Sequence, residues 1–140
     1  MITGPPDPEP QVTMLKPINP AEFPTPASNY SQGMVHSLAG ERLVISGQVG
    51  VGSDGNAVKG LDAQMVQAWD NFLTVLKTAG FAPAHVVKVT VYVTQPALMA
   101  FRRARETALP GHAPAATYVQ VAGLASPDYL VEIEGEAVKG

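Results

Sequence analysis

Hydrophobic and polar residues alternate with a period of two along the segment VVKVTVYVT at residues 86–94. Val87, Val89, Val91 and Val93 would point to one side of an extended chain, and the residues between them are lysine, threonine and tyrosine. Because successive side chains of a β-strand point to opposite faces, this pattern predicts a strand with one buried side.

A period of three to four residues marks the segment 61–79, which predicts an amphipathic helix. Asp62 is predicted to cap its start and Gly80 to end it. A second helix is predicted over residues 96–108, with Pro96 at an initial position where proline is tolerated. The apolar positions of the first helix are Leu61, Met65, Ala68, Phe72, Val75, Leu76 and Ala79.

Four further strands are predicted from short apolar runs bounded by turn residues. They span residues 33–39, 42–48, 115–122 and 130–138, and a tight Gly-Glu turn joins the first two. The resulting order is strand, strand, helix, strand, helix, strand, strand. This order predicts an α+β fold in which both helices cover one face of a mixed sheet.

The last predicted strand carries carboxylates on one side only. Val131 and Ile133 would face the core, whereas Glu132, Glu134 and Glu136 would share the opposite face. Three carboxylates repel one another and resist burial. That face of the sheet is therefore expected to be solvated or to meet polar groups of another subunit.

The N-terminal region is rich in proline. Eight of the thirteen prolines lie between Pro5 and Pro26. Proline fixes φ and lacks a backbone donor, so residues 1–28 are predicted to form an extended arm with at most one short edge strand, at 11–16. Residues 29–140 are predicted to form a single domain.

Composition and charge narrow the function classes. The formal net charge of −3 and the absence of a basic stripe argue against nucleic acid or an anionic membrane as a partner. No basic segment followed by an apolar run opens the chain, and no stretch approaches the roughly 18 apolar residues of a membrane span. We therefore expect a soluble cytoplasmic protein.

The chain has no cysteine, which excludes a thiolate nucleophile and cysteine-based metal sites. His36, His85 and His112 show no spacing typical of metal ligands, so we expect neither a metal site nor a cofactor. Ser46 has no visible histidine and aspartate partners, so a catalytic serine triad is not expected.

Five segments in a fixed order resemble the RidA/YjgF family, members of which were also labelled L-PSP endoribonucleases. They are ISGQ at 45–48, QAWDNFLTVLKTAG at 67–80, VVKVTVYVT at 86–94, PAATYVQVAGL at 114–124 and VEIEGEAV at 131–138. The resemblance implies a chorismate-mutase-like fold assembled as a homotrimer with small pockets between subunits. It also implies hydrolysis of reactive enamines and imines, such as 2-aminoacrylate, to 2-keto acids and ammonia.

The resemblance implies roles for individual residues. Tyr30 matches a tyrosine that lines the family's pocket, and Glu132 matches a glutamate that handles water, so these two are the predicted catalytic residues. The alternatives are that Tyr30 only packs and that Glu132 belongs to a solvated acidic face of the sheet. Ser46, Gly47 and Gln48 match an SGQ turn whose backbone contributes to the substrate site.

This chain departs from the family pattern at Ala116, where relatives carry an arginine that holds the substrate carboxylate. A hydrogen bond to a charged group contributes about 1.5–3 kcal/mol, so its loss weakens transition-state binding of a small 2-imino acid by roughly 10- to 100-fold or more. Arg105, near a position where relatives carry a pocket asparagine, either compensates for this loss or belongs to a solvated helix face. Tyr118 either fills the vacated space or only packs.

We therefore predict hydrolysis of a small enamine-type, imine-type or related labile metabolite, with a specificity that differs from that of 2-aminoacrylate deaminases. Activity on 2-iminopropanoate is expected to be weak or absent. The alternative is a non-catalytic module that binds a small metabolite or serves as a scaffold. An endoribonuclease is disfavoured because the chain is acidic and lacks interleaved basic and aromatic residues.

Overall fold

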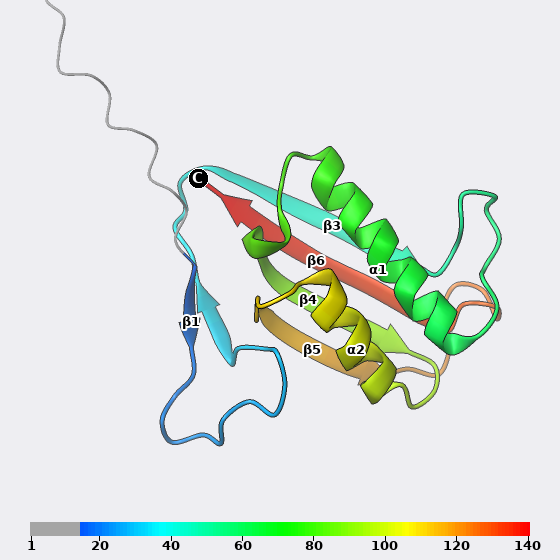
Figure 1. Ribbon diagram of the computed structural model, residues 1–140, viewed down its shortest axis with the longest axis horizontal. Coiled ribbons are helices and arrows are strands. Elements are labelled where there is room, and N and C mark those ends of the chain that lie inside the picture. The colour runs from blue at the N-terminus through cyan, green and yellow to red at the C-terminus, as the bar shows by residue number, and fades with distance from the viewer. Residues whose placement is uncertain (1–14) are drawn as a thin grey trace, which may run out of the picture.

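A computed structural model describes residues 15–140 of the chain. Its main feature is a four-stranded sheet with the strand order β3-β6-β4-β5, covered on one face by two helices (Figure 1). β4 and β5 run parallel, and the other neighbours are antiparallel. The elements are β3 (Glu41–Val49), α1 (Leu61–Thr78), η1 (Pro83–His85), β4 (Val86–Val93), α2 (Leu98–Ala108), β5 (Ala115–Gln120) and β6 (Val131–Lys139).

The hydrophobic core lies between the sheet and the helices. Val89, Val91 and Val93 of β4 are completely buried, and the residues between them are only partly covered. The apolar stripe of α1 meets this surface through Met65 and Phe72, which are also completely buried. The two periods seen in the sequence therefore correspond to the two layers of the fold, and the predicted α+β architecture is confirmed.

The predicted strand at 33–39 is wrong in length and pairing. Only β2 (Gly33–Val35) is extended, and it pairs with β1 (Lys16–Ile18) in a separate two-stranded sheet beside the main one (Figure 1). Leu38 is 95% exposed, so the apolar residue that suggested a longer strand has no core to pack against. The predicted strand at 11–16 lies mostly outside the described residues, and the boundary of the arm at residue 28 stays a prediction.

The helix ends differ in detail from the expectation. Gly60 is the N-cap of α1, and Asp62 lies in the first turn without making a capping hydrogen bond. Gly80 does end the helix, with a φ of 82° that favours glycine. α2 begins at Leu98, because Ala97 has an extended φ of −149°; Pro96 therefore precedes the helix.

The uncovered face of the sheet is polar, as the last strand predicted. Val131 and Ile133 are completely buried on the helix side, and the three glutamates of β6 are partly exposed on the other side. Arg42 forms an ion pair of 2.7 Å with Glu136 on this face. The hydroxyl of Tyr92 donates a hydrogen bond to Glu134, which raises the pKa of this tyrosine. Within residues 15–140, no helix is long and apolar enough to span a bilayer.

Candidate functional site

Four of the predicted site residues meet in one cavity of about 240 Å³, which we call the helix-side cavity. They are Tyr30, Arg105, Ala116 and Tyr118, which come from three separate parts of the chain. The cavity lies between α2, the edge strand β5 and the segment that precedes β2. Its full lining is Ser28, Tyr30, Leu98, Phe101, Arg102, Arg105, Ala116, Thr117 and Tyr118.

The segment before β2 reaches this cavity because it is fastened to the start of β5. The backbone N–H of Ser31 donates to the carbonyl of Pro114 over 3.0 Å, and its hydroxyl donates to the carbonyl of Ala113 over 2.5 Å. Ser31 also forms a parallel bridge with Ala115. These contacts place the neighbouring Tyr30 next to the strand that carries Ala116.

Ala116 lies on the helix side of β5. It is in register with the completely buried Val89 of β4, and paired residues in neighbouring strands point to the same face. The methyl side chain of Ala116 carries no charge and occupies little space at the sheet wall of the cavity.

Arg105 is buried rather than solvated, so the interpretation of a solvated helix face is wrong for this residue. Its exposed fraction is 2%. One Nη donates to the hydroxyl of Ser28 over 3.0 Å, and the guanidinium carbon lies 4.7 Å from the centre of the Phe101 ring. Burial, followed by the nearby charge of Arg102, lowers the pKa of Arg105.

The two arginines of the helix-side cavity have unsatisfied donors. The Nε atoms of Arg102 and Arg105 are buried without a hydrogen-bond acceptor in the described chain. Among residues 15–140 no carboxylate lies within ion-pair distance of either. Buried charges are ordinarily paired, so this wall of the cavity carries positive charge that no carboxylate of the described residues balances.

Tyr118 has a structural role and also lines the cavity. Its hydroxyl accepts a hydrogen bond from the backbone N–H of Ala97 over 2.8 Å, and its ring packs 5.6 Å from that of Phe101. The residue thereby ties the start of α2 to β5. Because Tyr118 both packs against Phe101 and borders the cavity, the structure does not decide between a packing role and a role in filling the space beside Ala116.

Ser46, Gly47 and Gln48 do not form a turn, contrary to the expectation. They lie within β3 at a β-bulge, where the pairing with β6 shifts between Ile45 and Gln48. The side chain of Gln48 donates to the carbonyl of Ser46 over 3.0 Å. A bulge inserts one extra residue and locally disrupts the ladder, which frees backbone groups at this point.

Glu132 lies across the bulge. A Cβ atom at Gly47 would come within 2.2 Å of one carboxylate oxygen of Glu132, so a side chain at this position would displace the carboxylate. Ser46 and Gly47 are exposed, and Gln48 and Glu132 are partly exposed. Gln48 is in register with Ile133, which faces the helices, so we call Ser46, Gly47 and Glu132 the open-face group.

The open-face group does not reach the helix-side cavity within one chain. Glu132 projects from β6 on the uncovered face, whereas Ala116 projects from β5 toward the helices, and β4 separates the two strands. The structure thus brings together Tyr30, Arg105, Ala116 and Tyr118 at one place and the remaining predicted site residues at another.

The sequence did not indicate five residues that line the helix-side cavity: Ser28, Leu98, Phe101, Arg102 and Thr117. Arg102 and Arg105 are three positions apart, and residues at that spacing lie on the same side of a helix. This spacing, together with Phe101, could have indicated that the two arginines share a cavity. A solvent-exposed helix shows the same spacing, so the pattern does not distinguish the two cases.

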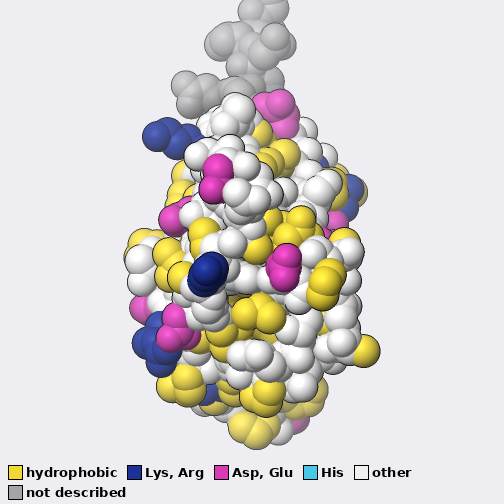
Figure 2. All heavy atoms as spheres, turned by 90° about the vertical axis from the view of Figure 1, so that its right-hand side faces the viewer, with side chains coloured by type: hydrophobic (Ala, Val, Ile, Leu, Met, Phe, Trp, Pro, Cys, Tyr) yellow, Lys and Arg dark blue, Asp and Glu magenta, His cyan; other side chains and the backbone are white. Residues whose placement is uncertain are grey.

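The described residues contain no group of three or more histidine, aspartate or glutamate side chains that would hold a metal ion. On the face shown in Figure 2, acidic and basic side chains are interspersed among hydrophobic ones. This face therefore offers no continuous basic surface of the kind that nucleic acids require.

The fold and these two groups of residues describe an α+β domain with a small cationic cavity at a sheet edge. The family model described as Endoribonuclease L-PSP matches residues 21–139, and the chain belongs to this family. A RutC family protein from Aquifex aeolicus (strain VF5) is 34% identical over 82 residues, or 57% of this chain. That match spans 62% of the relative, less than two thirds of its length.

Solved structures agree with this assignment. The Rid family protein YyfB of unknown function from Yersinia pestis has a TM-score of 0.80 and 34% identity, covering 89% of this chain and 98% of that one. RidA from the Antarctic bacterium Psychrobacter sp. PAMC 21119 has a TM-score of 0.67 and 28% identity, covering 88% and 98%. The predicted membership of the RidA/YjgF family is therefore confirmed.

Proposed function

We propose that this protein hydrolyses a small enamine-type, imine-type or related labile metabolite. The active site would join the helix-side cavity of one subunit to the open-face group of a neighbour in a homotrimer. The observation that carries the proposal is the convergence of Tyr30, Arg105 and Ala116 on one small cavity lined by unpaired cationic groups. Membership of the family supports it independently.

The reaction needs one water molecule and no redox partner. An enamine first takes a proton on carbon to become an imine, and water then adds to the carbon of the C=N bond. Glu132 would accept a proton from the attacking water and pass it to the nitrogen, which gives a carbinolamine. A second transfer, of the hydroxyl proton of the carbinolamine to the nitrogen, would break the C–N bond and release ammonia and a carbonyl product. Tyr30 would orient the substrate by a hydrogen bond from its hydroxyl.

Specificity follows from where the positive charge lies. The sheet wall carries Ala116 and no cation, whereas Arg102 and Arg105 approach from the helix wall. An acidic group of the substrate would therefore bind toward α2, and the open space at Ala116 would accept a longer or bulkier body. A minimal substrate such as 2-aminoacrylate fills this cavity poorly, because it has no side chain that would occupy the space at Ala116.

The test compares imino acids of increasing size, each generated in the assay by an amino acid oxidase. We expect kcat/KM for 2-iminopropanoate and for 2-aminoacrylate to lie roughly 10- to 100-fold below that for imino acids with four or more side-chain carbons, because each further buried methylene contributes about 0.8 kcal/mol. Glu132→Gln is the negative control for background hydrolysis.

Ala116→Arg sharpens the test. It restores a cation on the sheet wall, and we expect it to raise activity on 2-aminoacrylate while it lowers activity on the bulkier imino acids. No turnover of any imino acid by the wild type or this variant, with saturable binding of the corresponding keto acids, would replace the proposal by a non-catalytic binding module.

A further inference from the structure

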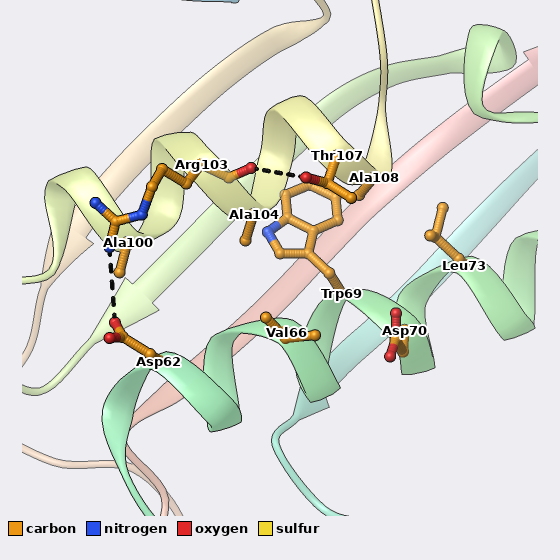
Figure 3. Close-up of a pocket in the computed structure, with 10 residues that line it drawn as sticks. All are labelled: Asp62, Val66, Trp69, Asp70, Leu73, Ala100, Arg103, Ala104, Thr107 and Ala108. Carbon is orange, nitrogen blue, oxygen red and sulfur yellow. Dashed lines mark hydrogen bonds and ion pairs between the residues drawn. The ribbon is translucent and has the colours of Figure 1, made fainter.

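A second cavity, of about 290 Å³, lies between α1 and α2 (Figure 3). We call it the interhelical groove, and the function proposed above does not use it. Phe101 lies between it and the helix-side cavity, since its ring packs against both Trp69 and Tyr118. The groove is lined by Asp62, Val66, Trp69, Asp70, Leu73, Ala100, Arg103, Ala104, Thr107 and Ala108.

Small residues on α2 create the space. Ala100, Ala104 and Ala108 recur every four positions and therefore lie on one side of the helix, the side that borders α1. Larger side chains there would interdigitate with α1, as helix ridges ordinarily do. The two helices pack closely beneath the groove, around Trp69, and leave a hollow above it.

Trp69 is the floor of the groove and has an unsatisfied donor. The residue is 1% exposed, and its ring is fixed by an edge contact with Phe72 at 5.3 Å and a stacked contact with Phe101 at 6.3 Å. Its indole N–H is buried without an acceptor among the described residues. Figure 3 shows the nitrogen edge of the ring turned toward Ala104 of α2, into the space between the helices.

A buried donor left without a partner costs about 1–3 kcal/mol, and such groups in native structures call for an explanation. The fixed ring cannot turn its N–H elsewhere. A bound molecule with a hydrogen-bond acceptor at this depth would remove the penalty.

The rim of the groove is acidic overall. Asp62 and Asp70 contribute two carboxylates, and Arg103 contributes one guanidinium. Arg103 and Asp62 approach each other only to 3.9 Å, and their side chains are 66% and 81% exposed, so this pair is weak and readily opened. The hydroxyl of Thr107 is occupied, since it donates to the carbonyl of Arg103 over 3.2 Å. The net negative charge at the rim therefore favours binding of a cationic group.

We propose that the interhelical groove is a second ligand site, which binds a small molecule with a ring-sized apolar body, a hydrogen-bond acceptor and a protonated amine. The acceptor receives the indole N–H of Trp69. The apolar body lies along Val66, Leu73 and the alanines of α2. The amine binds Asp62 or Asp70 at the rim. This site is independent of the proposed hydrolysis.

The chain has one tryptophan, so its fluorescence reports on the groove alone. The probe is 4-(aminomethyl)benzamide, which carries all three features, and benzylamine is the comparison because it lacks the carbonyl acceptor. We expect a saturable change in emission with the amide, and an affinity for benzylamine at least about 10-fold lower, since one hydrogen bond to a buried donor corresponds to about one decade.

Two variants decide whether the response arises in the groove. Ala100→Leu fills it from a partly exposed position and should abolish binding, whereas Ala125→Leu adds the same bulk on an exposed loop and should leave binding unchanged. Trp69→Phe, followed by calorimetry, should bind the amide at least about 10-fold more weakly while its affinity for benzylamine stays unchanged. This comparison carries the test if Ala100→Leu does not fold.

Absence of a saturable response up to the solubility of the amide would overturn the proposal. Binding that survives both Ala100→Leu and Trp69→Phe would do the same, because the probe would then lie elsewhere. Equal affinity for the amide and benzylamine would show that no acceptor meets Trp69, and that a solvent molecule alone satisfies its N–H.

Discussion

The helix-side cavity and the open-face group differ in burial and in the sign of their charge. The cavity is bordered by the buried Arg105 and by aromatic rings, and its unpaired charge is positive. The open-face group is more exposed, and its charge is the carboxylate of Glu132 above Gly47. The first region suits an anionic ligand and the second suits proton transfer, yet they lie on opposite faces of one sheet. The proposed function needs both properties in one site, which is why we propose that a second subunit completes it.

Gly47→Ala tests the open-face half and should have the largest effect. A methyl group there would lie within 2.2 Å of the Glu132 carboxylate, so the side chain must move away, while the backbone at this position does not require glycine. We expect turnover to fall by roughly 10²- to 10⁴-fold, the usual contribution of a positioned acid or base, with an unchanged circular dichroism spectrum.

Gly123→Ala is the matched control, because a Cβ atom there meets nothing within 4 Å. Normal turnover by Gly47→Ala would remove Glu132 from the mechanism.

Subunit mixing tests whether the two halves act together. Glu132→Gln removes one half, and the double substitution Arg102→Met with Arg105→Met removes the other. If the site forms between subunits, co-purified oligomers that contain both inactive chains should regain about a third of wild-type activity, because about one in three sites of a mixed cyclic trimer combines both intact halves. Assays of doubly tagged, co-purified oligomers provide the measurement.

Each chain purified alone is the control for that experiment. Activity that stays at the level of the single chains, in oligomers shown by mass spectrometry to be mixed, would place both halves of any active site within one chain.

Arg105→Met separates function from stability in the helix-side cavity. Methionine keeps most of the volume and removes a buried charge that no carboxylate partners. We expect kcat/KM for anionic substrates to fall by roughly 10- to 100-fold. The free energy of unfolding should stay constant or rise by about 1 kcal/mol, because burial of the charge no longer opposes folding.

Arg103→Met is the comparison on the other side of the same helix, where the side chain is 66% exposed, and should change neither quantity. A loss of stability in Arg105→Met without a loss of activity would make Arg105 a structural residue.

The smallest expected effect is a change of folding stability with pH. His85 precedes β4, and its Nδ1 accepts a hydrogen bond from the backbone N–H of Ala82 over 2.9 Å. Burial, followed by the charges of Lys139 and His112, lowers the pKa of His85 below its ordinary 6.5. The unfolded chain then binds the proton more readily, so stability should fall as the pH decreases below that ordinary value.

Urea unfolding at about pH 7.5 and about pH 5 measures this change. His85→Asn, which keeps an acceptor and cannot be protonated, should show a smaller loss of stability between the two values. An equal loss in both proteins would exclude His85 as its source.

The layers of the fold were predictable because they depend on local periodicity. The alternation of apolar and polar residues along β4 and the apolar stripe on α1 each indicate which side of the element is buried. The predictions were wrong where the structure depends on strand pairing or on backbone geometry. Residues 33–39 contribute only a short strand to another sheet, and the SGQ segment is a bulge within β3. No periodicity records which strand a segment will pair with.

The amino-acid sequence by itself determined the α+β class, the polar character of the last strand's open face, the family, and the absence of an arginine at Ala116. Only the tertiary structure decided that Arg105 is buried beside that alanine, that Arg102 joins it, and that Glu132 lies on the opposite face. The physical reason is that charge and spacing are local properties, whereas burial and the partner of a charge depend on segments far away in the chain. Arg105 meets Ser28 across 77 positions, a contact that no pattern within α2 contains.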